Sequence, residues 1–269
     1  MCNREFQKRR REGIMPELEW MRDKKVEEIG DEVAEKEIVR LDKWGKYVEN
    51  KPIMRVSSGI PGLDSLMESG FPKGSNIIAI GLKGTGKSTF AMQFIAEGCK
   101  KGERCLYITV EQSPPSIIKQ ALQYHWPFQE WEQKGNLQFA YLNFKKPMSS
   151  KMFEYIIRTV EQGHWDRIVL DSISALLNAA FPIAYSNILE LFEKTAEHGV
   201  TTVCVAQKDD ANRANEFIEY VGDGVLLFER NILGDKSNRT VALEKLRLTK
   251  INDVPHDIEF TENGIGIIV

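Results

Sequence analysis

Beyond residue 52, short apolar runs alternate with segments in which apolar residues recur at helical spacing. The apolar runs predict strands at 76–81, 104–110, 137–142, 166–171 and 200–206. The helical spacing predicts helices near 87–100, 115–125, 150–162 and 186–198. Strands that alternate with helices favour an α/β fold, with a mostly parallel sheet and helices on both faces.

From residue 224 onward the helical spacing is absent. The segments that read as strands or hairpins are GVLLFER, RTVALEKLRLT, DIEF and GIGIIV, and GDKSN at 234–238 predicts a turn. We therefore expect the C-terminal part to extend the sheet in antiparallel fashion.

The first fifty residues have a different composition, with twelve Lys or Arg and thirteen Asp or Glu. Apolar residues at roughly helical spacing predict an amphipathic helix at about 17–48, with a break near Gly30. Such a helix either packs on the flank of its own domain or docks onto a neighbouring subunit or another protein. The predicted organisation is a charged helical extension at 1–51 and one larger α/β domain at 52–269.

The net charge of -3 is mild, and a general polyanion binder would usually be more basic. The four cysteines form no C-x-x-C pair and have no His at zinc-ligand spacing, which indicates reduced thiols. The sequence contains no signal peptide and no apolar run of membrane-spanning length. These features predict a soluble cytoplasmic protein.

A phosphate-binding loop is predicted within NIIAIGLKGTGKST, which matches G-x-x-x-x-G-K-[ST] from Gly81 to Ser88. Glycines at 81, 84 and 86 allow successive backbone N–H groups to converge on one concavity. The following helix begins there and adds the positive end of its dipole. Lys87 is then placed to reach the β- and γ-phosphates, and the Ser88 hydroxyl to bind Mg²⁺.

Two acids follow later strands. Asp171 ends the run RIVLD, where it either organises Mg²⁺ or caps a turn. Glu111 follows the strand at 104–110, and the carboxyl ends of parallel strands form the edge at which ligands bind. We predict that Glu111 orients or deprotonates the water that attacks the γ-phosphate. Ser113 is the predicted N-cap of a helix that Pro114 begins.

These motifs stand in order along residues 52–269, together with the blocks SSGIPGLDSL, YVGDGVLLFE and VALEKLRLTK. In this ordered set of motifs, the chain resembles the KaiC-like single-domain ATPases of the RecA superfamily, of the type found in archaea. The resemblance implies a RecA-like core that binds ATP and Mg²⁺, with Asp171 and Ser88 at the metal and Glu111 as the catalytic acid. The residues that it implies at the triphosphate are Gly81, Lys83, Gly84, Thr85, Gly86, Lys87, Ser88 and Thr89.

The resemblance also implies residues that act between subunits. Lys245 and Arg247 match a K-x-R pair that reaches the γ-phosphate of a neighbouring subunit, which implies a ring such as a hexamer. Because the two residues are two positions apart on a predicted strand, their side chains would point to one face of it. The alternative is that both are solvated charges on an exposed strand. Gln207, at the end of VTTVCVAQ, matches a glutamine that senses the γ-phosphate.

Two departures from the family pattern bear on activity. Gln112 stands where a second glutamate is usual, so we expect slow hydrolysis. Leu248 and Ile251 stand where a glycine and a histidine are frequent, so the loop that reaches the neighbour is expected to have a different shape.

DNA binding is expected to be weak or absent. RecA-type recombinases bind DNA through two loops that correspond here to about 172–185, which has no basic residue, and 208–220, where acids outnumber Lys208 and Arg213. Phosphate neutralisation supplies most of the affinity for nucleic acid. The predicted function is that of an oligomeric Mg-ATP-hydrolysing ATPase with a regulatory or signalling role. The alternatives are a nucleotide-gated scaffold with little turnover and a recombinase paralogue that assists DNA repair.

Overall fold

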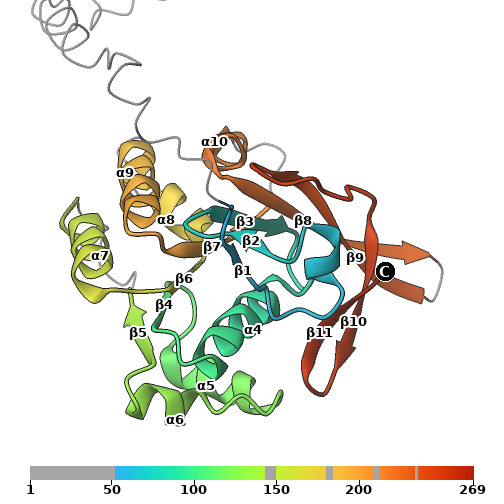
Figure 1. The fold of residues 1–269 in the computed structure, drawn as a ribbon, viewed down its shortest axis with the longest axis horizontal. Helices are drawn as coiled ribbons and strands as arrows, with labels where there is room; N and C mark the ends of the chain where they lie inside the picture. Colours follow the sequence, from blue (N-terminus) through green and yellow to red (C-terminus); the bar gives the residue numbers. More distant parts are fainter. Residues whose placement is uncertain (1–51, 143–149, 180–183, 209–212, 234–235) are drawn as a thin grey trace, which may run out of the picture. The chain divides into compact units, whose positions relative to one another are not determined.

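The computed structural model describes residues 52–142, 150–179, 184–208, 213–233 and 236–269 (Figure 1). Its main feature is a nine-stranded sheet in the order β11-β10-β9-β8-β3-β7-β6-β4-β5. The parallel strands are β3 (Asn76–Gly81), β4 (Cys105–Thr109), β5 (Leu137–Tyr141), β6 (Arg167–Asp171), β7 (Thr201–Gln207) and β8 (Gly224–Leu233). The antiparallel strands are β9 (Lys236–Leu246), β10 (His256–Thr261) and β11 (Gly264–Ile268).

Helices cover both faces of this sheet (Figure 1). One face carries the 3-10 helix η2 (Leu63–Leu66) and the helices α4 (Lys87–Lys100), α5 (Pro114–Leu122) and α6 (Phe128–Gln133). The other face carries α7 (Ser150–Gly163), α8 (Ile173–Ala179), α9 (Ala184–Glu197) and α10 (Arg213–Val221). A separate two-stranded antiparallel sheet pairs β1 (Arg55–Val56) with β2 (Phe71–Pro72).

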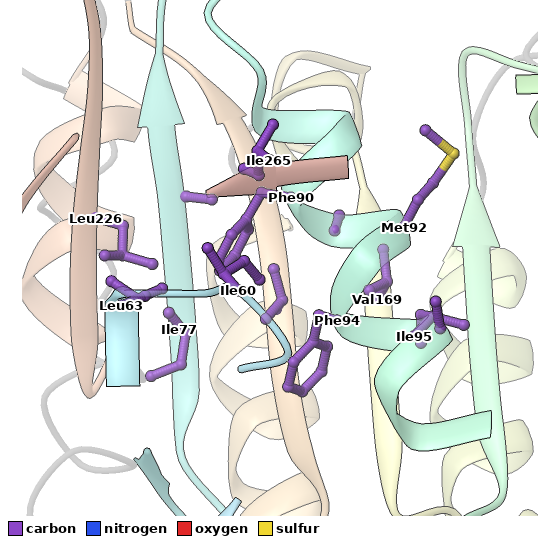
Figure 2. Close-up of a cluster of buried hydrophobic side chains, with 14 of the residues drawn as sticks. Ile60, Leu63, Ile77, Phe90, Met92, Phe94, Ile95, Val169, Leu226 and Ile265 are labelled. Atoms are coloured by element: carbon purple, nitrogen blue, oxygen red, sulfur yellow. The ribbon is translucent and has the colours of Figure 1, made fainter. Parts of the chain in front are cut away.

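The central strand β3 shows why its sequence is an unbroken apolar run. Ile77 and Ala79 belong to the core beneath α4, and Ile78 and Ile80 belong to the core on the opposite face. Because successive side chains of a strand point to opposite faces, a strand covered on both sides needs apolar residues at every position. Figure 2 shows the α4 side of this arrangement, where Phe90 and Phe94 lie in one cluster with Ile77 and Val169.

The α/β architecture with an antiparallel C-terminal extension is confirmed. So are the five strands and the four helices predicted between residues 76 and 207, within a few residues at their ends. Three short helices, α6, α8 and α10, were not predicted. The segments expected as loops at 172–185 and 208–220 therefore contain helix, because α8 and α10 occupy parts of them.

Two boundaries differ from prediction. β9 begins at Lys236, so residues 236–238 of the expected turn lie in a strand, and residues 234–235 lie outside the described residues. β4 ends at Thr109, which leaves Glu111 two residues beyond the strand. The helix predicted at 17–48 lies outside the described residues. Among the residues that the structure describes, we find no helix that is both long and apolar enough to cross a membrane.

Candidate functional site

The phosphate loop joins β3 to α4, and two of its glycines have backbone angles that disfavour other residues. Gly84 and Gly86 have φ values of 76° and 108°, in the left-handed region that only glycine enters freely. A Cβ on Gly81 would lie 2.0 Å from the carbonyl oxygen of Phe228 on β8. The spacing of glycines in the motif thus reflects one close strand contact and two left-handed residues.

Lys87 begins α4 and turns its side chain back into the loop. Its ammonium donates hydrogen bonds to the carbonyl oxygens of Gly81 at 2.8 Å and Leu82 at 2.6 Å. Burial lowers the pKa of Lys87 to about 8, although the nearby carboxylates of Asp171 and Glu111 favour the charged form. A buried ammonium held by the loop's own carbonyls is well placed to exchange these partners for phosphate oxygens.

Asp171 ends β6 and faces the first turn of α4. The phenol of Tyr107 on β4 donates a hydrogen bond of 2.9 Å to its Oδ2, and the Ser88 hydroxyl is a second partner. Burial raises the pKa of Asp171 above its ordinary value, while these two hydrogen bonds and Lys87 oppose that rise. Beside it lies a small cavity of about 30 Å³ lined by Ser88, Thr109, Glu111, Gln112 and Asp171.

The residues around this small cavity fit a magnesium ion. Hard divalent cations are bound by carboxylate, hydroxyl and water oxygens, usually with only one or two carboxylates beside a nucleotide. Asp171 and Ser88 supply such oxygens and already contact each other. The space is about that of a single water molecule, which suits one ion or one of its bound waters.

Glu111 lies on the exposed rim of the site, and the Ser172 hydroxyl donates a hydrogen bond of 2.7 Å to its Oε1. The next residue, Gln112, accepts a hydrogen bond of 2.9 Å from Nε2 of Gln120 on α5. Ser113 stands at the N-cap of α5 as predicted, but its side chain makes no capping hydrogen bond. Glu111 is therefore held by Ser172, the residue that follows β6.

A larger cavity of about 410 Å³ joins these groups (lining residues: Lys83, Gly84, Thr85, Gly86, Lys87, Ser88, Thr89, Glu111, Asp171, Ser172, Val205, Gln207, Arg239 and Phe260). Its size is that of an ordinary ligand pocket. All the predicted phosphate-loop residues except Gly81 line it, as do both predicted acids. The structure therefore brings together the groups that phosphate and magnesium chemistry requires.

Arg239 and Phe260 are site residues that sequence reasoning missed. Nε of Arg239 donates a hydrogen bond of 2.9 Å to the carbonyl oxygen of Gly84, and the guanidinium lies 4.9 Å from the ring centre of Phe260. Both come from the antiparallel extension, which reaches the loop because β9 pairs with β8 and β8 with β3. No local sequence motif identifies such residues, because strand pairing brings them to the loop.

The family model described as ATPase: KaiC matches residues 56–269. The chain belongs to the KaiC family of ATPases. A UPF0273 protein of Pyrococcus horikoshii is 28% identical over 78% of this chain and 92% of its own length. The circadian clock protein KaiC3 of Synechocystis is 30% identical over 82% of this chain. The match covers 46% of KaiC3, so the chain spans about half of that longer protein. The solved structure of a KaiC-like protein of P. horikoshii superimposes with a TM-score of 0.72 at 29% identity, covering 81% of this chain and 100% of that one.

In this KaiC-type fold Gln207 ends β7 at the edge of the cavity. Its backbone N–H donates to the Ser174 hydroxyl at 2.9 Å, and its carbonyl accepts from the Asn215 side chain at 3.1 Å. Both partners belong to the helices α8 and α10, which sequence reasoning missed. The residue therefore links the cavity to both helices.

Lys245 and Arg247 lie away from this chain's own cavity. Leu246 pairs with Gly224 and Gly224 with Ile77 near the start of β3, whereas the phosphate loop follows the end of β3 at Gly81. The two basic residues therefore stand at the opposite edge of the sheet, on the order of 15 Å away at the usual rise per strand residue. They can act on a nucleotide only if it is bound by another copy.

Both basic side chains also have partners within the chain. The Lys245 ammonium donates to the carbonyl oxygens of Glu219, Tyr220 and Gly222 at 3.0, 2.9 and 2.6 Å, at the C-terminal end of α10. Nη1 of Arg247 bonds to Oδ1 of Asp223 at 3.1 Å. Arg247 itself stands in the turn just beyond β9. The alternation of side chains along a strand therefore does not place it on the same face as Lys245.

Proposed function

We propose that the chain hydrolyses Mg-ATP slowly at this cavity, within an oligomer whose nucleotide state serves a regulatory or signalling role. The observation that carries the proposal is the convergence of Lys87, Ser88, Asp171 and Glu111 on one cavity, from the start of α4, the end of β6 and the connection after β4. A cation, a metal-binding pair and an exposed carboxylate are the parts that phosphoryl transfer to water needs.

The chemistry assigns one task to each group. Glu111 accepts a proton from a water molecule as its oxygen bonds to the γ-phosphorus. The bond from the γ-phosphorus to the β,γ-bridging oxygen breaks, which yields ADP and inorganic phosphate. Lys87 neutralises charge on the β- and γ-phosphates, and Ser172 keeps Glu111 in position through its hydrogen bond. A bound Mg²⁺, held by Ser88 and Asp171, would further neutralise the phosphate oxygens.

Two features support slow turnover and assembly. Gln112 carries an amide, which does not take up a proton as a carboxylate does. Glu111 is therefore the single carboxylate in the connection between β4 and α5. Lys245 and Arg247 stand at the sheet edge opposite the chain's own cavity. Their charges suit the γ-phosphate of a neighbouring copy, which makes the assembled form the active one.

The proposal is tested by ATP turnover with Mg²⁺, measured at increasing protein concentration for the wild-type protein and Glu111→Gln. We expect turnover that rises more than linearly with protein concentration in the wild type and is lost in the variant. Glu130→Gln, an exposed acid on α6, is the matched control and should behave as wild type. Equal turnover by wild type and Glu111→Gln would contradict catalysis, and nucleotide-dependent assembly without turnover would favour the scaffold alternative.

A further inference from the structure

The turn that follows β9 contains an unusual leucine. Leu248 has φ of 59°, in the left-handed region, and its side chain is 70% exposed. The other non-glycine residues with positive φ in the described part of the chain are Glu68, Ser69, His125 and His164, all polar. For a branched apolar residue, both this backbone angle and the contact with water are unfavourable in free energy. Such a cost at an exposed position indicates a function for the side chain.

The turn is held rigidly from one side by Arg55. Its guanidinium donates to the carbonyl oxygen of Leu248 at 3.0 Å and to the Thr249 hydroxyl at 2.6 Å, and it is itself paired with Glu68 at 2.6 Å. From the other side, the backbone N–H of Arg247 donates to the carbonyl oxygen of Asp223 at 2.8 Å. Leu248 is thus presented on a fixed turn, and little conformational freedom remains to be lost when it binds a partner.

Exposed apolar side chains accompany the leucine around the basic pair. Tyr220 is 77% exposed, and its carbonyl oxygen accepts hydrogen bonds from both Lys245 and Arg247. Met54, next to Arg55, is also mostly exposed. We call this set, Met54, Tyr220, Lys245, Arg247 and Leu248, the Leu248 patch. Apolar anchors around an arginine are typical of the centre of a protein interface.

The chemistry of the patch matches the phosphate-loop face of a second copy. That face carries three basic side chains, Lys83, Lys87 and Arg239, beside the acids Glu111 and Asp171. A bound triphosphate supplies the excess of negative charge, so the loaded face is complementary to Lys245 and Arg247. It also exposes two large apolar side chains, Leu82 at 57% and Phe260. Within one chain the two faces lie at opposite sheet edges, so they can meet only between copies.

We propose that Leu248 is the anchor of this contact: it packs on Leu82 and Phe260 of a second copy and so sets Arg247 at that copy's nucleotide. The inference rests on the proposed function, because it requires a site that a second copy completes. Leu248 is then a positioning residue, whose strained backbone is retained for the contact between subunits.

The first test separates the stability of the protomer from assembly. Leu248→Asn and Leu248→Gly both accept the left-handed backbone and remove the apolar anchor. We expect an unchanged or higher melting temperature of the nucleotide-free protomer. With Mg-ATP, dissociation constants from analytical ultracentrifugation should rise by about tenfold or more, the loss expected for a central apolar anchor. Leu122→Asn, at a 51% exposed leucine on α5, is the matched control and should leave assembly unchanged.

The second test places the partner surface. A Leu248→Cys chain is mixed with a differently sized Leu82→Cys chain, both carrying Cys2→Ser, and oxidised with diamide, which takes up the two thiol hydrogens as the disulfide forms. We expect a mixed covalent dimer that increases with Mg-ATP. The pair Leu122→Cys with Leu82→Cys should give none. The three cysteines of the described core, Cys99, Cys105 and Cys204, are buried.

The outcomes distinguish this inference from the proposed function. Normal assembly of both Leu248 variants, with turnover that still depends on Arg247, would overturn the anchor and leave the intersubunit site standing. A wild-type protein that neither assembles with Mg-ATP nor shows concentration-dependent turnover would overturn both. A dimer formed equally well by the Leu122 pair would also overturn the inference.

Discussion

Tyr107 donates a hydrogen bond of 2.9 Å from its buried phenol to Oδ2 of Asp171 on the neighbouring strand. The pairing Thr109↔Asp171 aligns β4 with β6, so the phenol reaches the carboxylate along the face of the sheet that α4 covers. Burial and the adjacent carboxylate raise the pKa of Tyr107 well above its ordinary value, so the phenol stays a donor at neutral pH. The bond fixes one oxygen of the carboxylate that we propose organises the metal.

Tyr107→Phe removes this bond while keeping the ring that packs on Phe139. We expect about a tenfold loss of Mg²⁺ affinity, the lower end of the range for residues that orient a metal ligand. The pKa of Asp171 should rise further. As the pH falls, the variant should therefore lose Mg²⁺ binding at a higher pH than the wild type does. Mg²⁺ titrations of ADP binding at several pH values measure both effects. Tyr141→Phe, at an exposed tyrosine on β5, is the control, and an unchanged Mg²⁺ midpoint in Tyr107→Phe would contradict the assignment.

Lys87 makes nucleotide binding depend on pH. Its pKa is about 8 because it is buried, and a bound triphosphate stabilises the ammonium and raises that pKa. Binding should therefore take up a proton above pH 8. The affinity for ATP should be constant below pH 8 and fall by about tenfold per pH unit above it, as one linked proton requires.

Calorimetry of ATP binding between pH 6.5 and 9.5, in buffers of different ionisation enthalpy, measures this proton uptake directly. Lys87→Arg is the matched variant, because arginine stays charged over the whole range. It should bind ATP more weakly but without the alkaline loss. A wild-type affinity that stays flat to pH 9.5 would show that Lys87 keeps its ordinary pKa in the free protein.

The sequence predicted the part of the site that is local in the chain. Gly84, Gly86, Lys87 and Ser88 follow one another on a single loop, so their types and spacing are enough to specify phosphate contacts. Asp171 and Glu111 were placed because parallel strands end at one edge of the sheet. These inferences need only the strand order of the fold class.

What the sequence did not reveal depends on pairing and on short elements. Arg239 reaches Gly84 through two successive strand pairings, which periodicity does not encode. The helix α8 has 7 residues and α10 has 9, about two turns and two and a half turns, so each shows only a short apolar stripe. The hydrogen bonds of Lys245 to α10 were therefore missed, because they require that helix to be known first.

Gln112 offers a test of how charge in the small cavity controls the metal. Its Oε1 accepts a hydrogen bond from Gln120, a role that a carboxylate keeps. Gln112→Glu adds a third negative charge beside Glu111 and Asp171. We expect a Mg²⁺ midpoint about tenfold lower and, without Mg²⁺, a free energy of unfolding lower by about 1 kcal/mol through like-charge repulsion.

Mg²⁺ titrations followed by ADP binding, together with urea unfolding with and without Mg²⁺, give both quantities. Gln123→Glu, which places a charge at the exposed C-cap of α5 and away from the cavity lining, is the control and should leave the Mg²⁺ midpoint unchanged. A Gln112→Glu protein with wild-type Mg²⁺ dependence would place the ion outside this cavity.

Lys245 and Arg247 should separate into a structural and a catalytic role. Lys245→Met removes three hydrogen bonds from the carbonyl oxygens that end α10, so the free energy of unfolding of the nucleotide-free protomer should fall by about 1–3 kcal/mol. Arg247→Gln removes an exposed pair with Asp223 and a long, exposed hydrogen bond of 3.5 Å to the carbonyl oxygen of Tyr220, so that free energy should change by about 1 kcal/mol or less. Turnover per subunit should nevertheless fall by at least about a hundredfold in Arg247→Gln, since a cation at the γ-phosphate acts mainly in the transition state. Urea unfolding and turnover at saturating ATP measure the two effects, with Lys250→Gln as the control for a nearby exposed charge. A destabilised Arg247→Gln with full turnover would reverse the assignment, and it would leave Lys245 as the residue that acts on the neighbouring copy.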